Sequence, residues 1–176
     1  ASDKISEAGD DLPLTGGTID ATGLEGPQAW TSNPFENVTK PITLIMNAGI
    51  TNISMAMVLP DNIDVIMPVG AIFHIEDTIT FKFHLSAASG LSQHFSINTG
   101  SVNPGIFMLL NVPLVHTRWF DDGSRDETCI QRAIDCRGEF WSGGVVFVDD
   151  VLNIRDTVLI GEKVLTGIRL INDAKI

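Results

Sequence analysis

The stretch Ile72-Phe73-His74-Ile75-Glu76-Asp77-Thr78-Ile79-Thr80-Phe81-Lys82-Phe83-His84-Leu85 decides how the rest of the chain is interpreted. From Ile79 to Leu85 every odd-numbered residue is apolar and every even-numbered residue is polar. A two-residue period is typical of a β-strand that has one face on a core and the other in water. Because a single strand is not stable alone, the stretch predicts a sheet that neighbouring parts of the chain complete.

Candidate strands continue on both sides of this stretch. Apolar segments recur at roughly ten-residue spacing, and turns that contain Pro, Gly and Asn separate them. The expected strands cover residues 42–46, 53–59, 63–67, 71–75, 78–85, 94–98 and 106–112, and then residues 145–148, 151–154, 157–160 and 164–171. Because no helical pattern separates most of them, the sequence predicts an all-β fold, a jelly-roll-like β-sandwich.

One short helix is expected near the C-terminal third of the chain. A helix over residues 126–137 is favoured by a polar capping residue at its start and by Gly138 after its end. In such a helix Cys129 and Cys136 share a face but lie about 10 Å apart, too far for a disulfide. We therefore expect two buried free thiols, whereas a disulfide would require a loop or hairpin here.

Charge is scarce in the middle of an otherwise acidic chain. The formal net charge is −11, yet five charged residues are found between positions 41 and 117: Asp61, Asp64, Glu76, Asp77 and Lys82. This usage favours strands that are buried against a second sheet or against other subunits. The acidic excess argues against a nucleic-acid or anionic-membrane partner, because phosphate groups are bound by clustered Lys and Arg.

The sequence carries no signal for a membrane. No window approaches about eighteen uninterrupted apolar residues, the length that a spanning helix requires. The opening Ala1-Ser2-Asp3-Lys4 is polar and acidic, unlike a signal peptide. We therefore expect a complete protein that is made in the cytoplasm and does not insert into a membrane.

Residues 1–37 differ in composition from the remainder. They contain seven acidic residues and one basic residue, together with three Pro and five Gly. Such a segment has too little apolar surface to fold alone. We expect an extended N-terminal arm over residues 1–37, which would reach on the order of 100 Å when stretched, followed by the β-sandwich domain over residues 38–176.

A short turn motif lies inside the expected arm. It comprises Leu12, Pro13, Leu14, Thr15, Gly16, Gly17, Thr18 and Ile19. Pro13 fixes its backbone φ angle, and the two glycines permit a sharp reversal of the chain. The motif is expected to present Leu12, Leu14 and Ile19 as anchors for a groove on a partner, although a flexible linker with a turn would have the same composition.

The phrase Pro-Leu-Thr-Gly-Gly-Thr, preceded by an apolar residue, resembles a short element of tail-fibre and related appendage proteins of tailed bacteriophages. The match covers about eight residues, and the element occurs once in the chain. The sequence departs from the usual continuation at Ile19-Asp20-Ala21-Thr22-Gly23. The resemblance implies a structural protein of a phage virion, made in the host cytoplasm.

Four aromatic residues flank the expected helix: Trp119, Phe120, Phe140 and Trp141. Aromatic rings around a charged insertion can form a platform for a ligand or partner, because rings stack on sugar faces or fill a protein groove. The alternative is that these rings close the core at one end of the sandwich.

No group of residues encodes a recognisable active site. His74 and His84, with Glu76, raise the question of a cupin-like metal site, but Gly70 and His74-Ile75-Glu76 give only a fragment of the cupin pattern, because its His-x-His element is missing. The acid pairs and glycines fit no calcium loop, phosphate loop or nucleophile elbow. We therefore expect a protein that is not an enzyme and has no metal or cofactor.

These expectations combine into a ranked set of functions. The first is a capsid decoration or cement protein, a homotrimer that binds the major capsid protein or another virion protein through residues 1–37. The second is a receptor-binding or carbohydrate-binding fibre tip that reads a glycan of the host surface. The third is a small cupin-like β-barrel enzyme.

Overall fold

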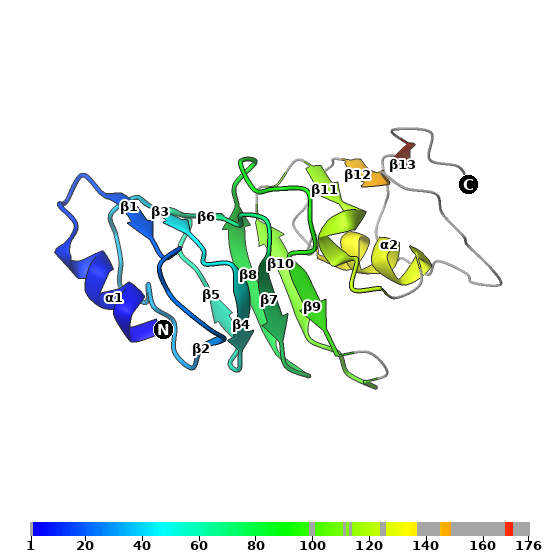
Figure 1. The fold of residues 1–176 in the computed structure, drawn as a ribbon, viewed down its shortest axis with the longest axis horizontal. Coiled ribbons are helices and arrows are strands. Elements are labelled where there is room, and N and C mark those ends of the chain that lie inside the picture. Colours follow the sequence, from blue (N-terminus) through cyan, green and yellow to red (C-terminus); the bar gives the residue numbers. More distant parts are fainter. Residues whose placement is uncertain are drawn as a thin grey trace.

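The chain is largely β and winds into a parallel solenoid (Figure 1). We analysed a computed structural model that describes residues 2–98, 101–110, 112, 114–123, 126–136, 145–148 and 168–170. Every strand pair in these residues is parallel. The predicted jelly-roll sandwich is therefore wrong, because a jelly roll is built from antiparallel strands.

The solenoid strands form two sheets, and a third sheet follows near the C-terminus. The bounds are β1 (Gly17–Asp20), β2 (Gln28–Trp30), β3 (Ile42–Ile45), β4 (Gly49–Ile53), β5 (Met57–Val58), β6 (Ile63–Ile66), β7 (Ala71–Ile75), β8 (Thr80–Leu85), β9 (Phe95–Ile97), β10 (Ile106–Leu110), β11 (Leu114–His116), β12 (Val145–Val148) and β13 (Ile168–Leu170). Sheet A has the order β1-β3-β6-β8-β10, with β5 also pairing with β8, and sheet B has the order β2-β4-β7-β9. The third sheet, sheet C, has the order β11-β12-β13.

Apart from β5 and β6, which are consecutive and both belong to sheet A, the chain alternates between sheets A and B, and each turn of the chain through both sheets forms one rung of the solenoid. On sheet B, Thr51 pairs with Phe73 and Phe73 pairs with Phe95, and the partners are 22 positions apart in both steps. Figure 1 shows the rungs stacked along one axis, with the N-terminal helix beyond the first rung and α2 near the opposite end.

Inward-facing aromatic side chains from the two sheets pack against one another in the core. Phe73, Phe81 and Phe83 have no exposed surface, which confirms the two-residue period expected for this stretch. The rings of Phe81 and Phe83 are stacked at 4.6 Å, and Phe73 meets Phe81 edge-on at 5.3 Å. Such contacts add to the hydrophobic stabilisation that burial itself provides.

The N-terminal segment packs on the solenoid. Residues Ser2–Asp11 form helix α1, and its Ile5 is 2% exposed. A Cβ placed on Gly9 would lie 3.8 Å from the Cδ1 atoms of Ile19 and Ile42, so the helix lies directly over the first rungs. The expected extended arm over residues 1–37 is not confirmed, because α1, β1 and β2 all contribute to the common core.

The C-terminal part of the described chain contains a 3-10 turn, η1 (Thr117–Phe120), and helix α2 (Asp126–Asp135). The helix lies where the sequence predicted it. Cys129 and Cys136 are buried and free, as expected. Strand β12 matches a predicted strand, whereas the strands expected over residues 151–160 lie outside the described residues. None of the described helices has the length and apolar character needed to cross a membrane.

Candidate functional site

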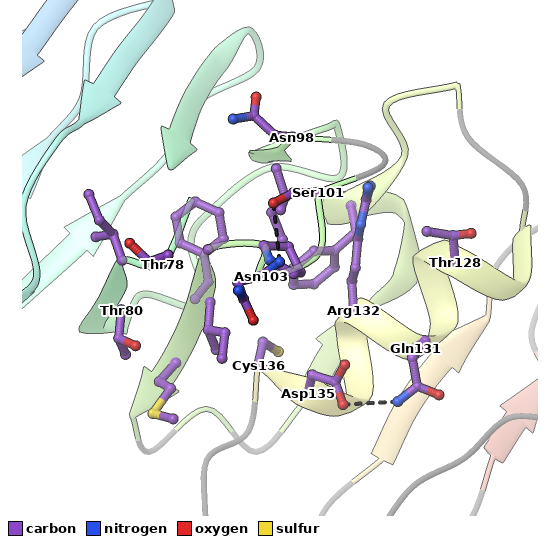
Figure 2. Close-up of a pocket in the computed structure, with 18 of the residues that line it drawn as sticks. Thr78, Thr80, Asn98, Ser101, Asn103, Thr128, Gln131, Arg132, Asp135 and Cys136 are labelled. Atoms are coloured by element: carbon purple, nitrogen blue, oxygen red, sulfur yellow. Dashed lines mark hydrogen bonds between the residues drawn. The ribbon is translucent and has the colours of Figure 1, made fainter. Parts of the chain in front are cut away.

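A groove of about 1090 Å³ lies between α2 and the outer corner of the last rungs of sheet A (Figure 2). We call it the α2 groove. Its main walls are residues 78–80 at the start of β8, residues 101–108 leading into β10, and residues 128–136 of and just after α2. Its volume is slightly above the range of about 300–1,000 Å³ that is usual for small-molecule sites.

The turn at the entrance of β8 is held in an unusual backbone conformation. Thr78 has a φ of 66°, and it is the one residue other than glycine with a positive φ in the described part of the chain. Its N–H donates a hydrogen bond to the carbonyl oxygen of Asn103 at 3.0 Å. Left-handed backbone at a non-glycine residue costs free energy and is enriched at functional sites.

The loop that leads into β10 fits tightly against this turn. A Cβ placed on Gly105 would lie 2.4 Å from the carbonyl oxygen of Glu76 and 2.7 Å from Cγ2 of Ile75. Only glycine allows the backbone to come this close. The close approach and the Thr78 hydrogen bond together fix the loop, and with it the position of Asn103 in the groove.

Neutral polar side chains line much of the groove. Thr78, Thr80, Asn98, Ser101, Asn103, Thr128 and Gln131 all contribute hydroxyl or amide groups. Within the described residues, the side chains of Thr80, Asn103 and Thr128 make no hydrogen bond, so their donors and acceptors are available to a ligand. Figure 2 shows Asn103 in the middle of the groove, between the β8 side and the α2 side.

The two charged residues of α2 that line the groove, Arg132 and Asp135, both have partners. The Nη1 atom of Arg132 donates to Oδ2 of Asp122 at 2.7 Å, and the two side chains are 12% and 14% exposed. The Nε2 atom of Gln131 donates to Oδ1 of Asp135 at 2.9 Å. A nearly buried ion pair of this kind balances its own charge, so the positive charge of Arg132 is directed to Asp122 and not to the groove.

Apolar side chains complete the groove wall. Val102 is 93% exposed and Ile106 is 40% exposed, and Ile79 and Met108 lie beside them. The rings of Phe107 and Phe120 are almost fully buried beneath this surface. The groove therefore combines an apolar patch with hydroxyl and amide groups.

The structure places two of the four predicted platform residues in the core. Trp119 is 4% exposed and Phe120 is 1% exposed. The indole Nε1 of Trp119 donates to the carbonyl oxygen of Gly90 at 3.0 Å, and the Phe120 ring lies 4.9 Å from that of Phe95. These two rings present no open face to a ligand. Phe140 and Trp141 lie outside the described residues.

The predicted anchoring motif forms the connection between α1 and β1. Leu12 packs against the core and Ile19 is 7% exposed, so both are used within this chain. The N–H of Gly16 donates to the carbonyl oxygen of Pro13 at 2.8 Å, which closes a turn. Leu14, at the tip of that turn, is 92% exposed. Pro13, Thr15, Gly17 and Thr18 are also exposed, and Gly16 is partly buried.

The histidines considered as metal ligands make pairwise contacts. Nδ1 of His74 lies 3.1 Å from Oγ of Ser96, and Nε2 of His84 lies 3.4 Å from Oδ1 of Asp61. In the part of the chain that the structure describes, no three His, Cys, Asp or Glu residues are grouped in a way that could hold a metal ion.

The residues of the α2 groove carry no signature that sequence reasoning detects. Thr78 and Asn103 are 25 positions apart, and only the stacking of consecutive rungs brings them together. The available signal was the turn at Asn103-Pro104-Gly105. It predicts a loop but does not indicate what the loop faces. The chain matches no protein-family model, no curated protein and no solved structure.

Proposed function

We propose that this chain is a non-enzymatic binding module of a tailed-phage virion appendage, and that it holds a neutral saccharide in the α2 groove. The observation that carries this proposal is the character of the lining: unpaired hydroxyl and amide groups beside an apolar patch, in a chain with a net charge of −11.

The chemistry of the groove suits a sugar. Sugar hydroxyls both donate and accept hydrogen bonds, as do the side chains of Thr80, Asn103 and Thr128. The C–H faces of a sugar ring are apolar and would contact Val102 and Ile106. Because the charge of Arg132 is already balanced by Asp122, an anionic sugar gains no attraction from it.

The groove favours binding over hydrolysis. Most glycoside hydrolases use two carboxyl groups on opposite sides of the bond that breaks. Asp135 is the single carboxylate among the described residues that line the groove, and its Oδ1 accepts a hydrogen bond from Gln131. The proposal therefore assigns no catalytic residue.

The virion context rests on the resemblance of residues 12–19 to an element of phage appendage proteins. It is independent of the groove. A module that binds a glycan of the host surface would be useful in a virion appendage. The protein would be made in the host cytoplasm and would act in the virion.

The test is binding of the purified full chain to an array of neutral and anionic glycans, followed by calorimetric titration with the neutral oligosaccharide that binds best. Asn103→Ala is expected to lower the affinity about tenfold or more, since each hydrogen bond lost is worth on the order of 1 kcal/mol and its partner is left unpaired. Asn37→Ala is the control, because Asn37 is exposed in the segment between β2 and β3 and does not line the α2 groove. Absence of binding to any neutral glycan would refute the proposal.

A second candidate is the role of a capsid decoration protein, and one observation favours it. Leu14 projects from the turn of the phage-like motif with 92% of its surface exposed, as a side chain that docks on a shell would. Cosedimentation with phage shells tests this role: Leu14→Asp should abolish attachment, whereas Thr15→Asp, which adds the same charge one residue away, should weaken it less. Equal attachment of Leu14→Asp and the unchanged protein would eliminate this candidate.

A further inference from the structure

None of the charged residues of the middle rungs lies on a strand of sheet B. Asp61 and Asp64 lie just before and on β6, Lys82 lies on β8, and Glu76 and Asp77 follow the end of β7. Both β6 and β8 belong to sheet A. Strands β4, β7 and β9 of sheet B therefore carry no Asp, Glu, Lys or Arg.

The segments that lead into these strands are uncharged as well. Residues 46–48, 67–70 and 86–94 form the corner between sheets A and B on three successive rungs, and they contain none of the four charged residue types. In a chain with 22 acidic and 11 basic residues, the sheet B strands and the corner of these three rungs thus carry no Asp, Glu, Lys or Arg. We call this surface the sheet B face.

The same surface exposes apolar side chains on adjacent rungs. Val69 is 73% exposed and Leu91 is 51% exposed. They occupy equivalent positions, because each lies four residues before one member of the Phe73–Phe95 pair. A Cβ placed on Gly90 would lie 3.2 Å from Cγ2 of Val69, so the two corner segments are in direct contact.

The outer side of the strands continues this apolar ridge. Ile50, which is 46% exposed, pairs directly with Ile72 of the next strand. Contiguous apolar surface on several rungs is unusual for a monomer and marks a site of association. The remaining outward residues of these strands include Asn52, His74 and Ser96, and none of them is Asp, Glu, Lys or Arg.

We propose that the sheet B face is the surface on which a second copy of this chain docks. The charge distribution decides between partners. A basic partner would be attracted to the acidic parts of the molecule, whereas two copies that both carry −11 repel each other everywhere except across an uncharged surface. The apolar ridge at that surface supplies the attraction that such a contact needs.

The contact is expected to be modest in size. Three strands at ~4.8 Å spacing and about five residues of ~3.3 Å each give roughly 240 Å² for the sheet, to which the corner adds. A standard interface buries about 800 Å² per partner, so reversible association that depends on concentration is expected. This inference stands apart from the saccharide proposal, since the exposed side chains of the sheet B face, Ile50, Val69 and Leu91, do not line the α2 groove.

Sedimentation velocity of the full chain over a wide concentration range tests the proposal. The unchanged protein is expected to shift from monomer to dimer or trimer as the concentration rises. Val69→Asp and, separately, Leu91→Asp are expected to remain monomeric, because each places a carboxylate opposite the partner's apolar ridge. Both side chains are exposed, and circular dichroism melting would establish that each variant folds.

Val58→Asp is the matched control. Val58 is 53% exposed on β5, away from the sheet B face, and receives the same substitution. It should associate like the unchanged protein. If the unchanged protein stays monomeric at all concentrations, the proposal is overturned, and a different protein becomes the expected partner of the sheet B face. Association of the Val69 and Leu91 variants at unchanged strength would overturn it as well.

Discussion

The tight approach of Gly105 to the β7–β8 turn leads to the sharpest stability prediction. In Gly105→Ala the new methyl group would lie 2.4 Å from the carbonyl oxygen of Glu76 and 2.7 Å from a carbon of the buried Ile75. Backbone must move to relieve the first contact, and overpacking of this kind costs about 1–3 kcal/mol. If the loop moves, the hydrogen bond from Thr78 to Asn103 is lost, which costs about 0.5–1.5 kcal/mol more.

The expected loss in the free energy of unfolding is therefore about 2–4 kcal/mol. Urea denaturation monitored by tryptophan fluorescence measures it. Gly23→Ala is the control, because a Cβ at Gly23 would meet no atom within 4 Å, so it should be neutral or slightly stabilising. If Gly105→Ala unfolded at the same urea concentration as Gly23→Ala, the packing described for this loop would be wrong. Saccharide binding should fall with Gly105→Ala, because Asn103 shifts with the loop.

Three further predictions concern the core, a surface carboxylate and the thiols. Phe83→Ala should cost about 3–5 kcal/mol in urea denaturation, since it empties a fully buried site, and a loss below about 1 kcal/mol would contradict the stacked core. Hydrogen bonds from the hydroxyl and then the N–H of Thr22 lower the pKa of Asp20. The bonds thus stabilise the fold above the ordinary pKa of Asp20, and this contribution disappears as the pH falls through the lowered value. Thr22→Ala should raise that pKa in an NMR titration, and an unchanged value would exclude the contact. Cys129 and Cys136 should resist a thiol reagent in the native protein and both react in denaturant, whereas a single reactive thiol or none in denaturant would contradict the free pair.

The sequence predicted which side chains are buried better than it predicted which strands are neighbours. Alternation at Phe81 and Phe83 identifies the inward face of β8 correctly, since this property depends on one strand alone. The same alternation at the same spacing fits a sandwich and a solenoid. The choice of neighbouring strands and the direction in which they pair depend on how the connections bring distant segments together. Equivalent positions such as Thr51 and Phe73 differ in residue type, so no repeat is visible in the sequence.

The N-terminal segment shows a different limit. Counting acids and glycines predicted an extended arm, but the acids of α1 lie on its outer side while Ile5, Ala8 and Leu12 face the core. Position within the helix mattered more than composition. The α2 groove was not predictable for a third reason: Asn103 meets Thr78 only after two rungs have stacked.

Helix α1 has a consequence for the behaviour of the molecule in concentrated solution. Strands β1 and β2 are the first members of their sheets, and the outward edge of a first strand carries backbone donors and acceptors that a foreign strand can pair with. With α1 seated over the first rung, another molecule cannot extend the ladder from this end. The helix thus acts against fibrillar growth, a hazard inherent in any stack of parallel strands whose end is left open.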